Sequence, residues 1–252
     1  MEMHATAATL EKELTFSRFD QMSQKYPNRS ALVYLGEHFS YRRLKNLSER
    51  FAGALSGLGV AKGHRVMIYI PNCAQWVIAF LGIQKLGAVV VPVAPIYTSH
   101  EIIYMINDAR VETVVCMDTK FCYVKEAFAE TDLKRVIVTN VADLLPAWKR
   151  WLGHLFDKIP TGKVDADPRM HRFTRLIQHA PLATTADIDP REDLSYILYT
   201  GGTTGFPKGV PGNHRGMTSY VNDVTEDVAG EHLREGQDTY IAINPLFHIM
   251  AL

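Results

Sequence analysis

The chain lacks three features that would decide its class at once: an excess of charge of one sign, a long apolar run and a cysteine framework. Lysine plus arginine equals aspartate plus glutamate at 27 each, so no overall field favours nucleic acid as a partner. No stretch reaches the roughly 18 uncharged apolar residues that a membrane span needs. Residues 1–14 show neither the basic segment nor the apolar core of a secretory signal. We therefore expect a globular, cytoplasmic protein.

Cysteine is scarce, with only Cys73, Cys116 and Cys122. Because each lies in or beside an apolar run, we expect buried thiols in a reducing compartment, in preference to a disulfide or a metal site. The composition, with 47% hydrophobic and 21% charged residues, predicts a large buried core.

Apolar runs of strand formers alternate along the chain with segments of helical periodicity. Ser40 is expected to cap the first helix, and Gly57 and Gly59 to end it. Strands alternating with helices indicate an α/β fold in which mainly parallel sheets are flanked by helices. Strands are predicted at 31–35, 65–70, 88–93, 113–117, 135–139, 194–199 and 239–243, and helices at 41–55, 74–86, 100–108 and 214–226.

The most informative segment is a glycine- and threonine-rich run that follows the predicted strand 194–199. Backbone N–H groups, hydroxyls and a cation are the groups that bind phosphate, and glycines at 201, 202, 205 and 209 allow positive φ. The run leaves the end of a strand, where open α/β sheets bind ligands. The predicted nucleotide-binding residues are Thr200, Gly201, Gly202, Thr203, Thr204, Gly205 and Lys208.

This run is not a Walker P-loop. Phe206 and Pro207 stand where that motif has its second glycine, and Gly209 follows Lys208 in place of a hydroxyl residue. Pro207 also disfavours a helical conformation at Phe206, so Lys208 is not expected to begin a helix.

Residues 199–209 instead resemble the nucleotide loop Y-T-[SG]-G-T-T-G-x-P-K-G of the adenylate-forming family, which includes acyl-CoA synthetases, luciferases and peptide-synthetase adenylation domains. Every fixed position of that signature is matched. Residues 39–44, 87–98 and 245–248 resemble further family segments in the same order. Their Pro-Ile-Tyr-Thr and Pro-Leu-Phe-His-Ile variants are most similar to those of bacterial medium- and long-chain fatty acyl-CoA ligases. A ligase for an aromatic acid, such as a coumarate or a benzoate, is the open alternative.

The resemblance implies a two-step reaction. A carboxylate and ATP form an acyl-adenylate, and coenzyme A then takes the acyl group as a thioester. Lys208 and His248 are the implied catalytic residues, Phe247 and His248 line the implied site of the fatty acid or other carboxylic acid, and Thr200 is an implied contact of Mg²⁺ through the phosphates. A satisfied core histidine is the alternative for His248. His214 follows a segment that departs from the family pattern, so capping or packing is an equal expectation for it.

The resemblance also implies that residues 1–252 are part of the large amino-terminal domain of such a ligase. The ribose-binding aspartate, the Mg²⁺-binding glutamate and a small mobile domain with an adenylation lysine would all follow Leu252. We therefore expect the chain alone to be catalytically inactive. A natural short form that acts as a non-catalytic nucleotide-binding or interaction module is the alternative.

One amphipathic stretch, residues 143–158, interrupts the alternation of strands and helices. Trp148 and Trp151 recur there at helical spacing beside basic residues, which is the pattern of a helix at a membrane interface. A helix packed on its own domain, or on a partner subunit in a homodimer, is the preferred expectation for this stretch. Peripheral contact with the inner membrane surface is the alternative.

Overall fold

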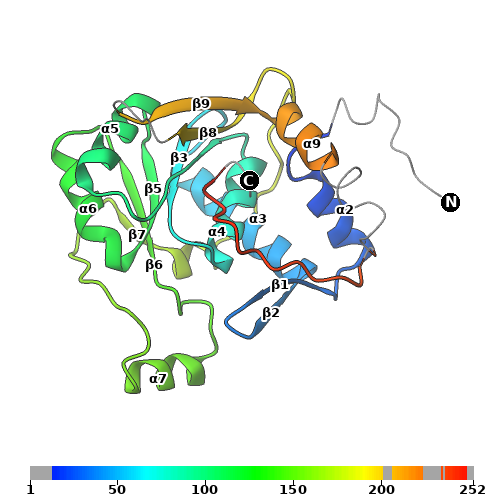
Figure 1. Cartoon of the computed structure of the whole chain (residues 1–252), viewed down its shortest axis with the longest axis horizontal. Helices are drawn as coiled ribbons and strands as arrows, with labels where there is room; N and C mark the ends of the chain where they lie inside the picture. The colour runs from blue at the N-terminus through cyan, green and yellow to red at the C-terminus, as the bar shows by residue number, and fades with distance from the viewer. Residues whose placement is uncertain (1–12, 201–205, 224–233, 235, 249–252) are drawn as a thin grey trace.

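The computed structural model describes residues 13–200, 206–223, 234 and 236–248. Among them, a seven-stranded sheet has the order β7-β6-β5-β3-β4-β8-β9, and every neighbouring pair is parallel except β8 with β9 (Figure 1). Its strands are β3 (Arg65–Tyr69), β4 (Val89–Pro92), β5 (Thr113–Met117), β6 (Arg135–Thr139), β7 (Met170–Arg172), β8 (Leu194–Thr200) and β9 (Lys208–Asn213).

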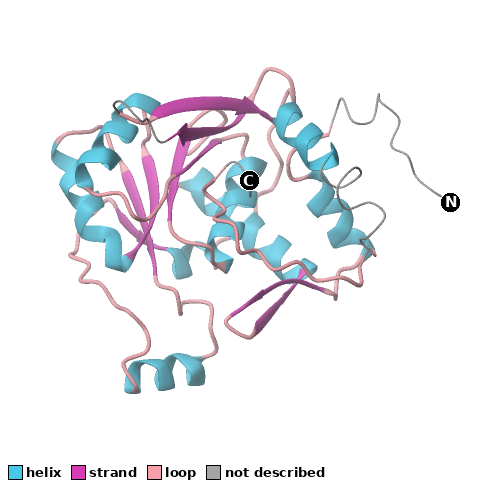
Figure 2. Ribbon diagram, viewed as in Figure 1, coloured by secondary structure: helices cyan, strands magenta, loops and turns pink. Residues whose placement is uncertain are grey.

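Helices flank the sheet, and a separate antiparallel hairpin joins β1 (Ser30–Tyr34) to β2 (Glu37–Ser40) (Figure 2). The predicted α/β architecture is therefore confirmed. The helices are α2 (Ser17–Lys25), α3 (Tyr41–Gly57), α4 (Ala74–Lys85), α5 (Ser99–Ala109), α6 (Phe121–Glu126), α7 (Ala147–Leu155), α8 (Phe173–Leu176) and α9 (His214–Asp223), with 3-10 turns η1 (Asp118–Lys120) and η2 (Ala127–Ala129).

The central strands are buried on both faces, because crossover helices cover both sides of a parallel sheet. In β3, Val66 and Ile68 belong to the apolar cluster that includes α3 and α4 residues. Met67 and Tyr69 belong to the cluster formed with α5 and α6. Side chains of a strand alternate between its faces, so a strand buried on both must be apolar throughout. This explains why the continuous apolar runs of the sequence became strands.

The start of α3 and its packing on α4 follow from local chemistry. Ser40 caps α3 as predicted, since its Oγ accepts a hydrogen bond from the backbone N–H of Arg43 at 3.2 Å. On α4, a Cβ at Gly82 would lie 2.8 Å from the carbonyl oxygen of Ser48. The two helices approach each other so closely because Gly82 has no side chain.

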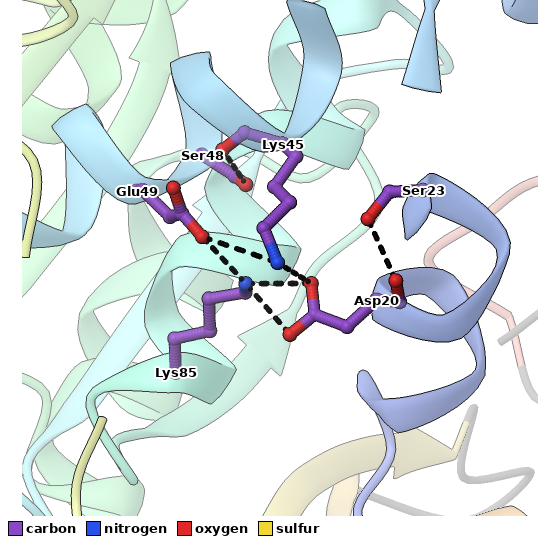
Figure 3. A network of polar contacts seen from close by, with 6 residues as sticks. All are labelled: Asp20, Ser23, Lys45, Ser48, Glu49 and Lys85. Atoms are coloured by element: carbon purple, nitrogen blue, oxygen red, sulfur yellow. Dashed lines mark hydrogen bonds and ion pairs between the residues drawn. The ribbon is translucent and has the colours of Figure 1, made fainter. Parts of the chain in front are cut away.

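An ion-pair cluster joins α2, α3 and α4 (Figure 3). The side chain of Lys85 is only 3% exposed, and its Nζ lies 2.8 and 2.9 Å from the two carboxylate oxygens of Asp20. Glu49 Oε1 lies 3.2 Å from the same Nζ. Lys45 also contacts both acids, at 3.0 and 3.5 Å, but its side chain is 30% exposed. Two carboxylates therefore neutralise the buried cation, as burial of a charge requires.

The predicted strand 239–243 is wrong. Residues 238–243 form no strand, and the side chains of Tyr240, Ile241 and Ile243 are 75–79% exposed. An alternating apolar pattern forms a strand only where a neighbour supplies the hydrogen-bonding edge, and no described strand pairs with this segment. Residues 224–226 of the predicted helix 214–226 lie outside the described part of the chain.

The expectation of three buried thiols holds for two of the cysteines. Cys73 and Cys116 are buried, and burial raises the pKa of the Cys73 thiol to about 12. Cys122 is exposed, because α6 turns Phe121 and Val124 toward the core and leaves Cys122 on its outer side. Of the helices described, none combines the length and the apolar character needed to cross a bilayer.

Candidate functional site at the carboxyl edge of the sheet

Strands β8 and β9 pair as an antiparallel hairpin, and the glycine- and threonine-rich run lies between them in the sequence. The last described pair, Thr200 and Lys208, is called the hairpin tip. Thr200 is paired with Lys208 at the end of the antiparallel ladder, and the Thr200 hydroxyl donates to the Lys208 carbonyl oxygen at 3.5 Å. The chain therefore leaves the sheet after Thr200 and returns to it at Lys208. Gly201, Gly202, Thr203, Thr204 and Gly205 lie between them, outside the described residues.

Helix α5 anchors both sides of this tip. The Tyr199 hydroxyl donates to Asp108 Oδ2 at 2.6 Å, and burial together with that carboxylate raises the pKa of Tyr199. After the tip, the ring of Phe206 stacks on Tyr104 with centroids 4.5 Å apart, and it lies 5.5 Å from His100. This support was not predicted, although the aromatic and acidic residues of 100–108 recur at helical spacing in the sequence.

Gly209 has a different role from the one predicted. Its φ lies outside the left-handed region, and the residue pairs with Tyr199 in the ladder. A Cβ at this position would lie 3.2 Å from Tyr199 Cζ and 3.1 Å from Ile197 Cγ2. Glycine leaves room here for the tyrosine ring that Asp108 holds, since a Cβ would press on that ring.

Lys208 presents its side chain at the edge of the sheet. It is exposed and begins β9, so the prediction that it does not begin a helix is confirmed. Within the part of the chain that the structure describes, no carboxylate lies within ion-pair distance of its ammonium group. Because nothing there neutralises this charge, the ammonium is available to an anionic ligand.

The base of β8 is fixed by buried polar side chains. Only Val90 and Tyr196 pair β4 with β8. Gln84 of α4 compensates, since its Nε2 donates to the Ser195 carbonyl oxygen at 2.7 Å and its Oε1 accepts from the Ser195 hydroxyl at 3.2 Å. The first bond supplies the Ser195 carbonyl oxygen with a partner that a longer ladder would have provided, and the second fixes the Gln84 amide in place. The hairpin is thereby held at its base by α4 and at its tip by α5.

His214 is a packing residue at the start of α9. It is fully buried, and its Nδ1 lies 2.7 Å from the Thr15 hydroxyl, which in turn lies 3.2 Å from the Ser195 hydroxyl. Burial lowers the pKa of His214 to about 4. The Asp193 carboxylate raises this pKa, and Lys62 lowers it by a smaller amount. The imidazole is therefore neutral near pH 7 and joins α9 to β8.

Asn72, which follows β3, holds the segment that carries Phe247 and His248. Its Nδ2 donates to the carbonyl oxygens of Ala242 at 3.2 Å and Asn244 at 2.8 Å, and its Oδ1 accepts from the Leu246 N–H at 2.8 Å. These three bonds pin the segment to the end of β3. Sequence patterns do not reveal the role of Asn72, because its partner segment lies about 170 positions away.

Phe247 and His248 lie in a turn that Asn72 supports. The His248 N–H donates to the Pro245 carbonyl oxygen at 2.9 Å. Phe247 is half-buried and His248 is exposed, so the alternative of a core histidine is wrong. An exposed imidazole beside a half-buried aromatic ring can contact a ligand that has both a polar and an apolar part.

The hairpin tip and the turn of His248 are attached to the same edge of the sheet. Strands β3 and β8 are both parallel to β4, which lies between them, so their carboxyl ends share one edge. With neighbouring strands about 4.8 Å apart, the two attachment points are about 10 Å apart along the sheet. In Figure 1 the segment after residue 236, in red, runs back across the molecule toward α4. This is the edge at which open α/β sheets bind ligands.

The site offers donors and one cation, which suits an anion. The described residues contain no group of three or more His, Cys, Asp or Glu side chains placed to hold a metal ion. The groups that the structure describes at this edge are the Lys208 ammonium, the Thr200 hydroxyl and the His248 side chain.

Known proteins have the fold of this chain, and others resemble it in sequence. A long-chain-fatty-acid–CoA ligase of Archaeoglobus fulgidus superposes with a TM-score of 0.74 at 24% identity, over 94% of this chain and 43% of that one. The long-chain-fatty-acid–CoA ligase of Bacillus subtilis is 30% identical over 249 residues, which are 97% of this chain and 43% of that protein. The Salmonella typhimurium enzyme of the same name is 31% identical over 243 residues, 93% of this chain and 42% of that protein.

The chain thus spans about two-fifths of the length of the curated relatives it matches. Residues 19–252 match the family model described as AMP-binding enzyme, which is nearly the whole of the chain. With the matched loop at a sheet edge, and with relatives of this identity, the chain belongs to the family of AMP-binding, adenylate-forming enzymes.

Proposed function

We propose that the protein carrying this chain is an ATP-dependent fatty acyl-CoA ligase. The observation that supports this best is the hairpin tip. Residues 199–209 match the nucleotide signature of the family, and the Lys208 ammonium beside them has no described counter-ion. The relatives reported above are named long-chain-fatty-acid–CoA ligases, which favours a fatty acid over an aromatic acid. Because the chain spans only part of those relatives, the reaction is assigned to the whole protein.

In the first step, a carboxylate oxygen of the substrate attacks the α-phosphorus of ATP. The bond from that phosphorus to the bridging oxygen breaks, and pyrophosphate leaves with its negative charge. Lys208, the hydroxyls of the loop and its backbone N–H groups hold the departing oxygens and stabilise the charge that develops there. Mg²⁺, when bound, neutralises further phosphate charge, and Thr200 is its proposed contact in this chain. The residues proposed to hold the phosphates are Thr200, Gly201, Gly202, Thr203, Thr204, Gly205 and Lys208.

In the second step, the thiol of coenzyme A loses its proton and its sulfur attacks the acyl carbonyl carbon. The bond from that carbon to the phosphate oxygen breaks, and AMP leaves. Phe247 and His248 line the acyl side of the site, where the aromatic ring packs on the chain of the acid and the imidazole orients its carboxylate. Asn72 acts through them as a positioning residue, because it holds their segment against the end of β3. We also propose that residues 1–252 alone do not turn over, since the relatives supply more than half of their length beyond the matched region.

The experiment is pyrophosphate exchange by the full-length protein with hexadecanoate. A hydrogen bond to a charged group contributes about 1.5 to 3 kcal/mol, so Lys208→Ala should lower exchange by roughly 10- to 150-fold. Lys208→Arg keeps the charge and should be less impaired, and Lys134→Ala, an exposed lysine paired with Glu112, is the matched control. Full exchange by Lys208→Ala would remove the role given to Lys208. Faster exchange with 4-coumarate than with hexadecanoate would overturn the choice of a fatty acid.

A further inference from the structure

Helix α7 turns its apolar side away from the protein. Trp148, Trp151 and Leu155 follow one another at helical spacings of three and four, and they are 60–64% exposed. Phe156, which comes directly after the helix, is 64% exposed. No residue of α7 is buried, and the helix stands apart from the sheet and its flanking helices (Figure 1). A helix packed on its own domain would place these residues inward.

The inner side of α7 explains how the helix is held. A Cβ at Gly153 would lie 2.4 Å from Ile159 Cδ1, so the glycine allows the helix to rest on a buried isoleucine. Lys149 Nζ lies 2.6 Å from Glu37 Oε1 and 3.4 Å from the Leu35 carbonyl oxygen. The helix is thus held by the close approach of Gly153 to Ile159, in the segment that follows it, and by the contacts of Lys149 with the β1–β2 hairpin, while Trp148, Trp151 and Leu155 stay exposed.

The hairpin extends the exposed apolar surface. Val33 is 47% exposed and Leu35 is 55% exposed, and the hairpin and α7 lie on the same side of the molecule in Figure 1. Exposed apolar residues that gather on one side of a protein mark a site of interaction. We call this surface the α7 face; it consists of Val33, Leu35, Trp148, Trp151, Leu155 and Phe156.

We propose that the α7 face lies against the surface of an anionic phospholipid membrane. Residues 147–158 carry Lys149, Arg150, His154 and Lys158, with Asp157 as the acid of that range. Lys149 is paired with Glu37, so Arg150, His154 and Lys158 are the basic residues left to meet the headgroups. Basic residues beside exposed tryptophans complement a negatively charged headgroup layer over acyl chains. A symmetric contact with a second copy would instead place two basic rims against each other. Charge therefore selects the membrane over self-association.

The test is co-sedimentation of the full-length protein with vesicles of phosphatidylcholine, alone or mixed with phosphatidylglycerol. We expect binding to the mixed vesicles that weakens as salt is raised. Trp148→Glu combined with Trp151→Glu should lower the bound fraction by about tenfold or more, since the anchoring side chains become anionic. The control is Ile96→Glu combined with Tyr220→Glu, which adds the same charges at exposed apolar residues outside the α7 face.

A second variant guards against misfolding of the first. Arg150→Gln combined with Lys158→Gln leaves the apolar residues in place and should weaken binding to the mixed vesicles only. Failure of the unchanged protein to bind mixed vesicles, or equal binding by the tryptophan variant, would overturn the proposal. So would light scattering that shows a dimer which the tryptophan variant converts to a monomer. Vesicle binding requires no turnover, so its failure is distinct from a failure of the proposed ligase activity.

Discussion

Lys85 and Lys208 show two opposite ways in which this chain places a cation. Lys85 lies in the cluster of α2, α3 and α4, almost completely buried, with three carboxylate oxygens within 3.2 Å of its Nζ. Lys208 lies at the hairpin tip, exposed, and no described carboxylate reaches it. A buried charge persists only when its neighbours neutralise it, whereas an exposed charge at a ligand-binding edge is useful only when they do not.

The difference separates the scaffold from the site. In the scaffold, charged side chains pair with one another. At the carboxyl edge of the sheet, the Lys208 side chain stays exposed to a ligand. The two regions should therefore respond differently to substitution: the scaffold should lose stability, and the edge should lose activity.

Removal of the buried cation should cause the largest change. Lys85→Ala leaves two carboxylates in the cluster with only Lys45, and loss of one member of a buried ion pair costs about 3 to 5 kcal/mol. We expect a decrease in the free energy of unfolding near the lower end of that range, measured with urea. Lys45→Ala is the matched control, because Lys45 contacts the same acids but is partly exposed, and it should cost about 1 kcal/mol or less. Equal effects of the two variants would mean that burial does not distinguish the lysines.

His214 sharpens the contrast, because it is buried and uncharged. Its pKa of about 4 in the folded protein lies below the ordinary value of 6.5, so the unfolded chain binds more protons as the pH falls. This contribution to stability is present above pH 6.5 and is lost between pH 6.5 and 4, by about 3 kcal/mol in total. His214→Gln should flatten the dependence of unfolding free energy on pH in that window. The exposed His179 offers the control, and an unchanged slope in His214→Gln would contradict the assignment.

Replacement of Asn72 by alanine tests the carboxyl edge of the sheet without a change in charge. Asn72→Ala removes three hydrogen bonds to the segment of Phe247 and His248 and should slow adenylation by about tenfold in the full-length protein. Asn72→Asp should be no better than alanine, because a carboxylate cannot donate to two carbonyl oxygens. The KM for the fatty acid should rise in both, while the KM for ATP stays the same. Asn46→Ala, which removes an amide that accepts from Arg50 on α3, is the control. A rise in both KM values alike would indicate general damage instead of positioning.

The smallest effect on stability is expected at Lys208. Its side chain is exposed and has no described charged partner, so Lys208→Ala should change the free energy of unfolding by about 0.5 kcal/mol or less. The same variant should show the large activity loss given above. A loss of stability comparable to that of Lys85→Ala would erase the contrast between the two regions.

Sequence patterns predicted those elements whose structure depends on local residues. The runs that became β3, β5 and β6 are apolar except at their ends, and the structure places them within a residue of the prediction. The nucleotide loop was found from a string of residues at the end of β8. Strand β9 was missed, because Lys-Gly-Val-Pro-Gly-Asn contains the residues that usually break strands. It pairs with β8 because Gly209 and Gly212 leave room for tyrosine rings: a Cβ at Gly212 would lie 2.2 Å from Tyr196 Cζ. The fit of these glycines depends on the tyrosines of the partner strand, and the role of Asn72 depends on a distant segment. Local sequence patterns show neither.

Pro211 in β9 has a consequence for the protein in a crowded cell. Within the described residues, β9 and the three-residue β7 are the outermost strands of the sheet, and such borders can recruit strands from other molecules. Pro211 pairs with Ile197 in the ladder and has no N–H that could bind a strand of another molecule. Among the described strands, one border is thus interrupted by proline and the other has three residues, and both features disfavour the addition of a strand from another molecule.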